Sequence, residues 1–211
     1  MGENKENTKR NPFVKIIYEV FPHIPRNKAN KNIRREIDSI GEMLTYNDEL
    51  SVLKTLKAPE KIDVKILRDM IDDNKHRMER LEDKSKVQIV GITLAISIMT
   101  GIAGSMKDLV LDTSWLKWVV FVVLLASVIY LFAAGIEAIH MLTNENVFYY
   151  LPYNISEQQD NELRQTYNAV VAKNQLQNTI RNNEISTSYA LMRNAIVLLL
   201  VVFVIWIIPV K

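Results

Sequence analysis

The sequence predicts an all-α membrane protein with three transmembrane helices, two of which continue into long cytoplasmic helices. Three apolar segments support this prediction: residues 87–106, 118–139 and 195–210, of 20, 22 and 16 residues. The chain has 26 basic and 24 acidic residues, and of these only Glu137 falls within the three segments. A bilayer core about 30 Å thick requires roughly 20 apolar residues per helix. Since no water-soluble fold separates its charges so sharply, we interpret the three segments as membrane spans.

The lysine and arginine positions predict how the spans are oriented, because basic loops stay on the cytoplasmic side. Basic residues precede the first and third spans: Arg77, Arg80, Lys84, Lys86, Arg181 and Arg193. We therefore expect residues 1–86 and 140–194 in the cytoplasm, and the 107–117 loop and the C-terminus outside. Aromatic side chains prefer the membrane interface, and the three tryptophans lie near the outer ends of the spans: Trp115, Trp118 and Trp206.

The N-terminal region, residues 1–60, is expected to hold short helices. Between Pro12 and Pro25 a short apolar patch has its large side chains at helical spacing. One interpretation is an interfacial helix lying on the inner leaflet. The other is a short helix packed on the cytoplasmic domain. Residues 32–57 are typical of a helix or a helical hairpin.

Two long helices are predicted to run from the cytoplasm into membrane spans. Residues 61–86 lead into the first span, and their apolar residues follow a short heptad seam with one polar member, Asn74. Asn74 either fixes helix register and oligomeric state or lies exposed to water. From Glu157 no glycine or proline interrupts the chain until Pro209, which permits one helix of about 50 residues. Its amide-rich cytoplasmic part is expected to pack on the 61–86 helix and on other subunits.

The first span carries small and hydroxyl-bearing residues on one helical face. Four residues form this face, at spacings of four, three and four: Thr93, Ser97, Thr100 and Gly104. Such a face fits the wall of a hydrated pore. It also fits a dry helix contact, in which each hydroxyl bonds to a carbonyl one turn earlier. Gly101, and Gly135 in the second span, are further candidates for close helix packing.

Glu137 is the one ionisable residue within the expected spans, and His140 follows it on the same helical face. A charge in hydrocarbon costs several kcal/mol, so such a residue usually faces a partner, a cavity or a pore. One interpretation is a cation-attracting ring or a pH-sensitive pair. The other is a carboxylate that reaches the inner interface, or that pairs with Lys84 or Lys86.

The residues that catalysis or a bound cofactor would require are missing from the sequence. There is no cysteine, and none of His23, His76 and His140 has a second histidine at metal-ligand spacing. Gly-rich phosphate-binding loops are also missing. We therefore expect no enzymatic activity, no cofactor and no metal. At a net charge of +2 we also expect no direct binding to nucleic acid.

The layout resembles the SLATT-type effectors, which are small all-helical membrane proteins of bacterial and archaeal defence islands. The likeness covers roughly residues 60–193: a charged helix running into a first span (DNKHRMERLEDKSKVQIVGITLAISIM), a short outer loop, a second span and a returning polar helix (RQTYNAVVAKNQLQNTIRNNEISTSYALMRN). The third span departs from the plain two-span form. The resemblance implies an effector of the bacterial inner membrane that kills the cell or arrests its growth. It also implies a cytosolic regulatory partner or a nucleotide-derived signal.

From these observations we expect a homo-oligomeric membrane pore or ion channel that a partner triggers or releases in antiphage defence. A closed ring of four or more subunits is expected, since a dimer rarely encloses a pore. The partners would be the lipid bilayer, further copies of the chain and a cytosolic regulator. The alternative is a non-conducting membrane anchor or scaffold that recruits a cytosolic partner through residues 1–60.

Overall fold

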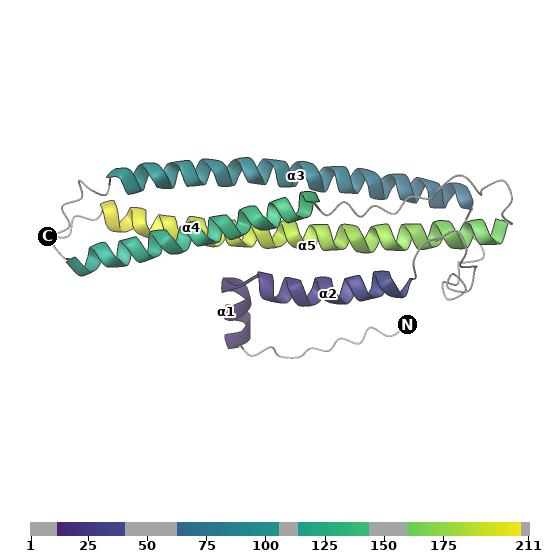
Figure 1. The fold of residues 1–211 in the computed structure, drawn as a ribbon, viewed down its shortest axis with the longest axis horizontal. Coiled ribbons are helices and arrows are strands. Elements are labelled where there is room, and N and C mark those ends of the chain that lie inside the picture. Colours follow the sequence, from purple (N-terminus) through teal and green to yellow (C-terminus); the bar gives the residue numbers. More distant parts are fainter. Residues whose placement is uncertain (1–11, 41–62, 106–113, 144–159, 208–211) are drawn as a thin grey trace.

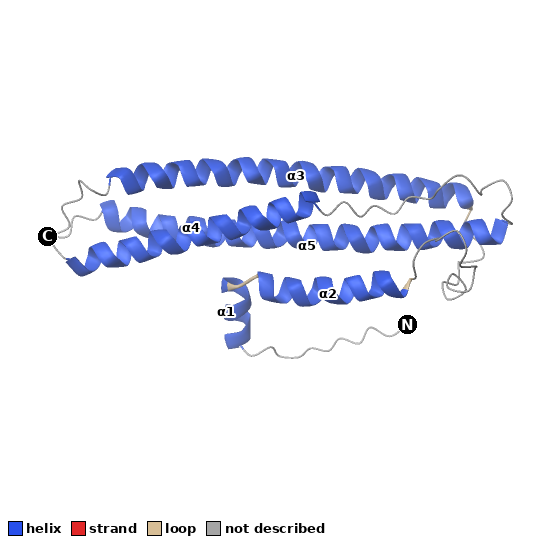
Figure 2. Ribbon diagram, in the orientation of Figure 1, coloured by secondary structure: helices blue, strands red, loops and turns tan. Residues whose placement is uncertain are grey.

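The computed structural model describes residues 12–40, 63–105, 114–143 and 160–207, and the regular structure in these ranges is entirely helical (Figure 2). Five helices follow one another in this part of the chain: α1 (Pro12–Val20), α2 (His23–Ser39), α3 (Val64–Ser105), α4 (Ser114–Thr143) and α5 (Asp160–Ile207). The predicted all-α class is therefore confirmed. α5 is one uninterrupted helix of 48 residues, as the absence of glycine and proline in this segment permits.

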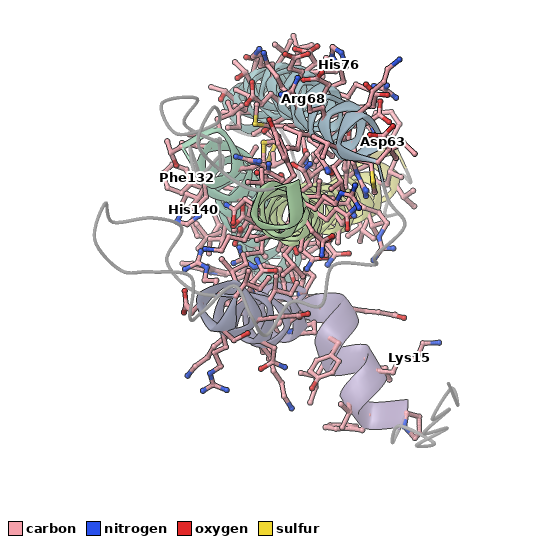
Figure 3. The ribbon with its side chains drawn as sticks, turned by 90° about the vertical axis from the view of Figure 1, so that its right-hand side faces the viewer. Lys15, Asp63, Arg68, His76, Phe132 and His140 are labelled. Atoms are coloured by element: carbon pink, nitrogen blue, oxygen red, sulfur yellow. The ribbon has the colours of Figure 1, made fainter. Side chains whose placement is uncertain are left out.

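α5 is the central helix, and α3 and α4 pack against it along the long axis of the molecule (Figures 1 and 3). α3 and α5 run in the same direction: Asn178 on α5 bonds to Asn74 on α3, and Gln88 bonds to Ser188 further along both helices. α4 runs in the opposite direction and lies beside only the C-terminal parts of α3 and α5 (Figure 1). The bundle therefore has a three-helix half and a two-helix half.

The three-helix half has an aliphatic interior. Its core side chains come from all three helices: Ile92, Met99, Val120, Leu124, Leu131, Ala134, Leu191, Ala195 and Val202. Its outer surface is also apolar, with large side chains exposed on α3, α4 and α5, among them Leu94, Phe121 and Leu200. Large exposed apolar surfaces mark sites of contact with a membrane or with another protein. The surface of this half is therefore consistent with membrane association.

The two-helix half has a polar interior instead. α5 carries buried polar and charged residues here: Lys173, Asn174, Gln177, Asn178, Arg181 and Glu184. The amide of Asn178 donates to the Asn74 backbone carbonyl at 2.9 Å, and its oxygen accepts from Arg181 at 3.1 Å. The expected packing of the amide-rich segment on the 61–86 helix is therefore confirmed, although the described contacts lie within one chain.

α2 lies along α5, on the side away from α3 (Figure 3). It begins at His23, whereas the sequence pattern places a helix only from residue 32. Pro25 does not prevent the early start, because the first-turn backbone nitrogens of a helix have no intrahelical acceptor. Residues 41–57 of the predicted 32–57 element lie outside the described residues.

α1 projects away from the bundle, across the direction of α2 and of the long axis (Figures 1 and 3). None of its residues is buried, and Phe13, Ile16 and Ile17 are all exposed. Two hydrogen bonds fix its C-terminal end: Tyr130 Oη donates to the Val20 carbonyl at 3.0 Å, and Asn194 Nδ2 donates to the Glu19 carbonyl at 2.8 Å. Whether α1 lies on the inner leaflet or on the cytoplasmic domain stays a prediction, because its residues are exposed while its C-terminal end is bonded to α4 and α5.

Two helical segments in the described part of the chain are long and apolar enough to cross a membrane: Trp115–Thr143 and Tyr167–Ile205. The first contains the second expected span, and the second contains residues 195–205 of the third expected span. The first expected span lies in α3, where the apolar stretch after Lys86 is interrupted by Gln88 and by threonine, serine and glycine. The structure therefore supports two candidate membrane spans, and it does not confirm the predicted third.

Candidate functional site

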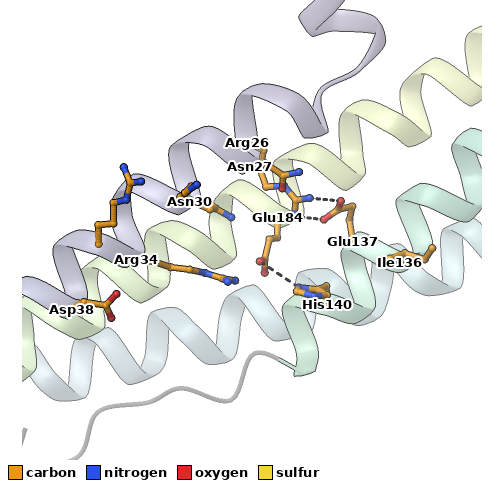
Figure 4. A pocket seen from close by; sticks show the side chains of 11 residues that line it. Arg26, Asn27, Asn30, Arg34, Asp38, Ile136, Glu137, His140 and Glu184 are labelled. Carbon is orange, nitrogen blue, oxygen red and sulfur yellow. Dashed lines mark hydrogen bonds and ion pairs between the residues drawn. The ribbon is translucent and has the colours of Figure 1, made fainter. Parts of the chain in front are cut away.

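The side chain of Glu137 on α4 is held by Arg26 on α2 (Figure 4). The two guanidinium nitrogens of Arg26 donate to the two carboxylate oxygens at 2.5 and 2.6 Å. Both side chains are largely buried, with 12% of Arg26 and 11% of Glu137 exposed. A paired arginine fork is the strongest common arrangement for a carboxylate, and here it joins α2 to α4 across 111 residues of sequence.

Glu184 on α5 lies beside this pair and is the more deeply buried carboxylate, at 1% exposed. Its Oε1 is 3.6 Å from Nδ1 of His140. Its Oε2 has no hydrogen-bond partner within the described part of the chain. Burial raises the pKa of Glu184, and the nearby His140 and Arg26 offset part of that rise. The cluster therefore joins two acids, an arginine and a histidine from three helices.

A pocket of 670 Å³ opens next to this cluster, between α2, α4 and α5 (Figure 4). We call it the α2 pocket. α2 contributes most of its wall, including three exposed basic residues, Lys31, Arg34 and Arg35. α4 contributes Ile136 beside Glu137 and His140, and α5 contributes Glu184. Its volume is in the range of small-molecule sites, which are about 300–1,000 Å³.

The helical repeat of α2 explains why its residues reach both the cluster and the pocket. Arg26, Asn30 and Arg34 are four residues apart, so they follow one another along one face of the helix. Asn30 is buried and accepts a hydrogen bond from Asn183 on α5 at 2.9 Å. This contact fixes the register of α2 on α5 and thereby sets the position of Arg26 opposite Glu137.

The structure brings Glu137 and His140 into one cluster, as their spacing suggested, but with partners that the sequence did not indicate. Glu137 pairs with Arg26, and Lys86 instead pairs with Asp83 at 3.3 Å. Arg26 was missed because its partner is 111 residues away. A signal for Glu184 existed: it continues the row of polar α5 residues at Gln177 and Arg181 that faces the neighbouring helices.

The hydroxyl-bearing face of α3 lies apart from this cluster and points away from α4 and α5. Thr93, Ser97 and Thr100 are all exposed, as is Gly104. Each of the three hydroxyls donates to the backbone carbonyl four residues earlier, at 2.9 Å. Within the described part of the chain, the face is therefore not used for packing between helices.

The remaining candidates for helix packing have different surroundings. Asn74 is 7% exposed and lies between α3 and α5, so its described contacts fix the register of two helices within one chain. At Gly135 an added Cβ would meet only Ile92 of α3, at 4.0 Å. At Gly101 and Gly104 it would meet no atom within 4 Å. Within the described part of the chain, no close helix contact therefore requires a glycine at these last two positions.

No three histidine, cysteine, aspartate or glutamate side chains in the described ranges are grouped so as to hold a metal ion. No protein-family model, curated protein or solved structure matches the chain.

Proposed function

We propose that the protein assembles into an oligomeric membrane pore or ion channel that disrupts the bacterial inner membrane. It crosses the membrane three times, with its N-terminal region in the cytoplasm and its C-terminus outside. A cytosolic partner or a nucleotide-derived signal triggers or releases it, in keeping with its resemblance to defence effectors. The observation that carries the proposal is the outward-facing hydroxyl surface of α3.

The exposed surface of α3 divides lengthwise into two stripes. One is aliphatic and contains Val90, Leu94 and Ile98, each at least 60% exposed. The other contains Thr93, Ser97 and Thr100. Lipid tails suit the first stripe. The second stripe suits either contact with water or close packing on a neighbouring helix. A ring of α3 helices would provide both a water-filled centre and helix–helix contacts.

The pore assignment depends on this hydroxyl face and not on Glu137. Arg26 neutralises Glu137 within the chain, so this carboxylate does not supply a free negative charge at the pore mouth. A ring of at least four copies would enclose the hydroxyl stripes, with the aliphatic stripes and α4 facing lipid.

The alternative is a non-conducting scaffold that recruits a partner through its N-terminal region. The exposed apolar residues of α1 favour it, because a projecting apolar helix can bind a protein. The same residues can lie in a membrane, so α1 does not by itself distinguish a scaffold from a pore.

The test is Ser97→Leu, which places an apolar side chain in the middle of the hydroxyl stripe. We expect ion leak from liposomes to fall by roughly tenfold or more, because a dewetting barrier of only about 1.4 kcal/mol has that effect. The oligomer should stay intact by mass measurement in mild detergent. Leu94→Ser is the matched control on the aliphatic stripe, and it should leave the leak unchanged.

Normal leak from an intact Ser97→Leu oligomer would refute the assignment of this face to a pore. Dissociation of the Ser97→Leu oligomer would show that the stripe is a helix contact. Absence of leak from the unmodified protein would favour the scaffold.

A further inference from the structure

The position of α1 indicates how deep the α2 pocket lies relative to a membrane. α1 is fixed at the level of Tyr130 on α4 and Asn194 on α5 by its two hydrogen bonds. Glu137 lies seven residues beyond Tyr130, which is roughly 10 Å along a helix that rises 1.5 Å per residue. The pocket is therefore displaced from α1 by about that distance, toward the two-helix half.

A short apolar helix that lies across the direction of membrane-spanning helices, as α1 does (Figure 1), has the arrangement of an interfacial helix. Such helices lie in the plane of the membrane with their apolar side chains about 5–10 Å below the headgroups. In α1, Phe13 and Ile16 are 68% and 59% exposed, so they can enter lipid without first leaving a protein core. Glu137 and His140 lie at the cytoplasmic end of the proposed 118–139 span, so the α2 pocket lies at the depth of the inner headgroups, and α1 lies about 10 Å farther into the bilayer, as an interfacial helix does.

The charges around the pocket favour an anion. Lys31, Arg34 and Arg35 are exposed, and none of them has a carboxylate within 4.0 Å in the part of the chain that the structure describes. Two acids of the wall have basic partners: Glu137 is paired with Arg26, and Glu184 lies 3.6 Å from His140. Asp38 is the remaining acid of the lining.

An apolar track leads away from the pocket toward the bilayer. Ile136 forms part of the pocket wall and is 52% exposed. Phe132, Ile129 and Leu125 continue from it along one face of α4, and each is at least 50% exposed. An inorganic phosphate or a soluble phosphate ester would leave this track empty, whereas the acyl chains of a lipid would cover it.

We propose that the α2 pocket binds the phosphate of an anionic phospholipid from the inner leaflet, whose acyl chains lie on the Ile136–Leu125 track of α4. Arg34 and Arg35 supply the planar guanidinium groups that bind phosphate oxygens in pairs, and Lys31 adds a third charge. Because α2 also carries Arg26, bound lipid would hold α2 against α4 and α5. This inference rests on the membrane orientation proposed above.

Lipid binding can be measured by native mass spectrometry of the full chain in mild detergent, titrated with phosphatidylglycerol or phosphatidylcholine. We expect phosphatidylglycerol to bind more tightly, and Lys31→Gln/Arg34→Gln to weaken its binding by roughly tenfold or more. The control Lys28→Gln/Lys65→Gln removes the same charge from exposed residues outside the pocket and should retain the preference. Glycerol 3-phosphate at millimolar concentration should not displace the lipid.

Three results would overturn the site: equal binding of both lipids, equal losses in the two double variants, or displacement by glycerol 3-phosphate. The last would indicate a soluble phosphate ligand. Extraction of the protein from membranes by alkaline carbonate is measured in parallel. Full extraction would refute the membrane topology itself, whereas retention with no lipid preference would refute only the site.

Discussion

The two halves of the bundle use the same central helix in opposite ways. In the three-helix half α5 buries aliphatic residues such as Leu191, Ala195 and Val202. In the two-helix half it buries Gln177, Asn178 and Arg181. The outer surfaces are reversed: the first half exposes aliphatic side chains, and the outer face of α3 in the second is rich in charged residues.

This difference follows from the solvent that each half is suited to. Where the surroundings are lipid, burying aliphatic side chains yields no hydrophobic gain, so close packing holds the helices together. Where the surroundings are water, a polar interface is stable only if its hydrogen bonds are satisfied, and satisfied bonds then fix the register. The Arg26–Glu137 pair and Glu184 lie where the two halves meet.

The largest expected effect comes from breaking the ion pair at this junction. Arg26→Leu keeps the volume of the side chain but leaves Glu137 buried without its partner, at a cost of about 3–5 kcal/mol. We expect α2 to lose its protection against hydrogen exchange. The double variant Arg26→Leu/Glu137→Leu should recover most of this loss, because no unpaired charge remains. Equal losses in the single and double variants would contradict this account.

A reciprocal exchange along α5 tests the contrast between the interiors directly. Leu191→Asn places an amide in the aliphatic core, with an expected cost of about 2–5 kcal/mol. Asn178→Leu removes the bonds to Asn74 and Arg181, with an expected cost of about 1–3 kcal/mol. Thermal unfolding in detergent measures both. A more stable Asn178→Leu variant would show that the hydrogen bonds of Asn178 do not fix the register of α5 on α3.

The smallest expected effect concerns pH and Glu184. Burial raises the pKa of Glu184, so the folded chain holds this proton more tightly than the unfolded chain does. Its contribution to stability is therefore lost as pH rises from the ordinary glutamate value near 4.5 through the raised pKa. Arg26 from α2, with Glu137 and His140 from α4, face the group and modulate this loss.

Glu184→Gln removes the titration and should be more stable than the unmodified protein above this pH window, with no difference at its acidic end. Thermal midpoints measured from pH 4.5 to pH 8 report the difference. Glu79→Gln is the matched control, because Glu79 also faces a histidine, His76, but both side chains are exposed. If the thermal midpoints of Glu184→Gln and of the unmodified protein change in parallel with pH, Glu184 does not contribute to the pH dependence of stability.

Three features could be predicted from the sequence alone: the helical class, the long uninterrupted α5 and the contact of its amide-rich part with α3. These features depend on local properties: apolar periodicity, the positions of glycine and proline, and the need of an amide-rich helix for a partner. The spacing of Glu137 and His140 likewise placed both on one face of α4. Helix propensity and periodicity act over a few residues, so they can be read along the chain.

Which surfaces meet depends on the tertiary structure. The pairing of Arg26 with Glu137, the projection of α1 and the outward direction of Thr93, Ser97 and Thr100 all depend on how α2, α3 and α4 lie on α5. Residues far apart in sequence contribute to each of these features, and many partners would satisfy the same local pattern. The choice among partners is a property of the packed helices, because a buried charge or amide is stable only where its own partner reaches it.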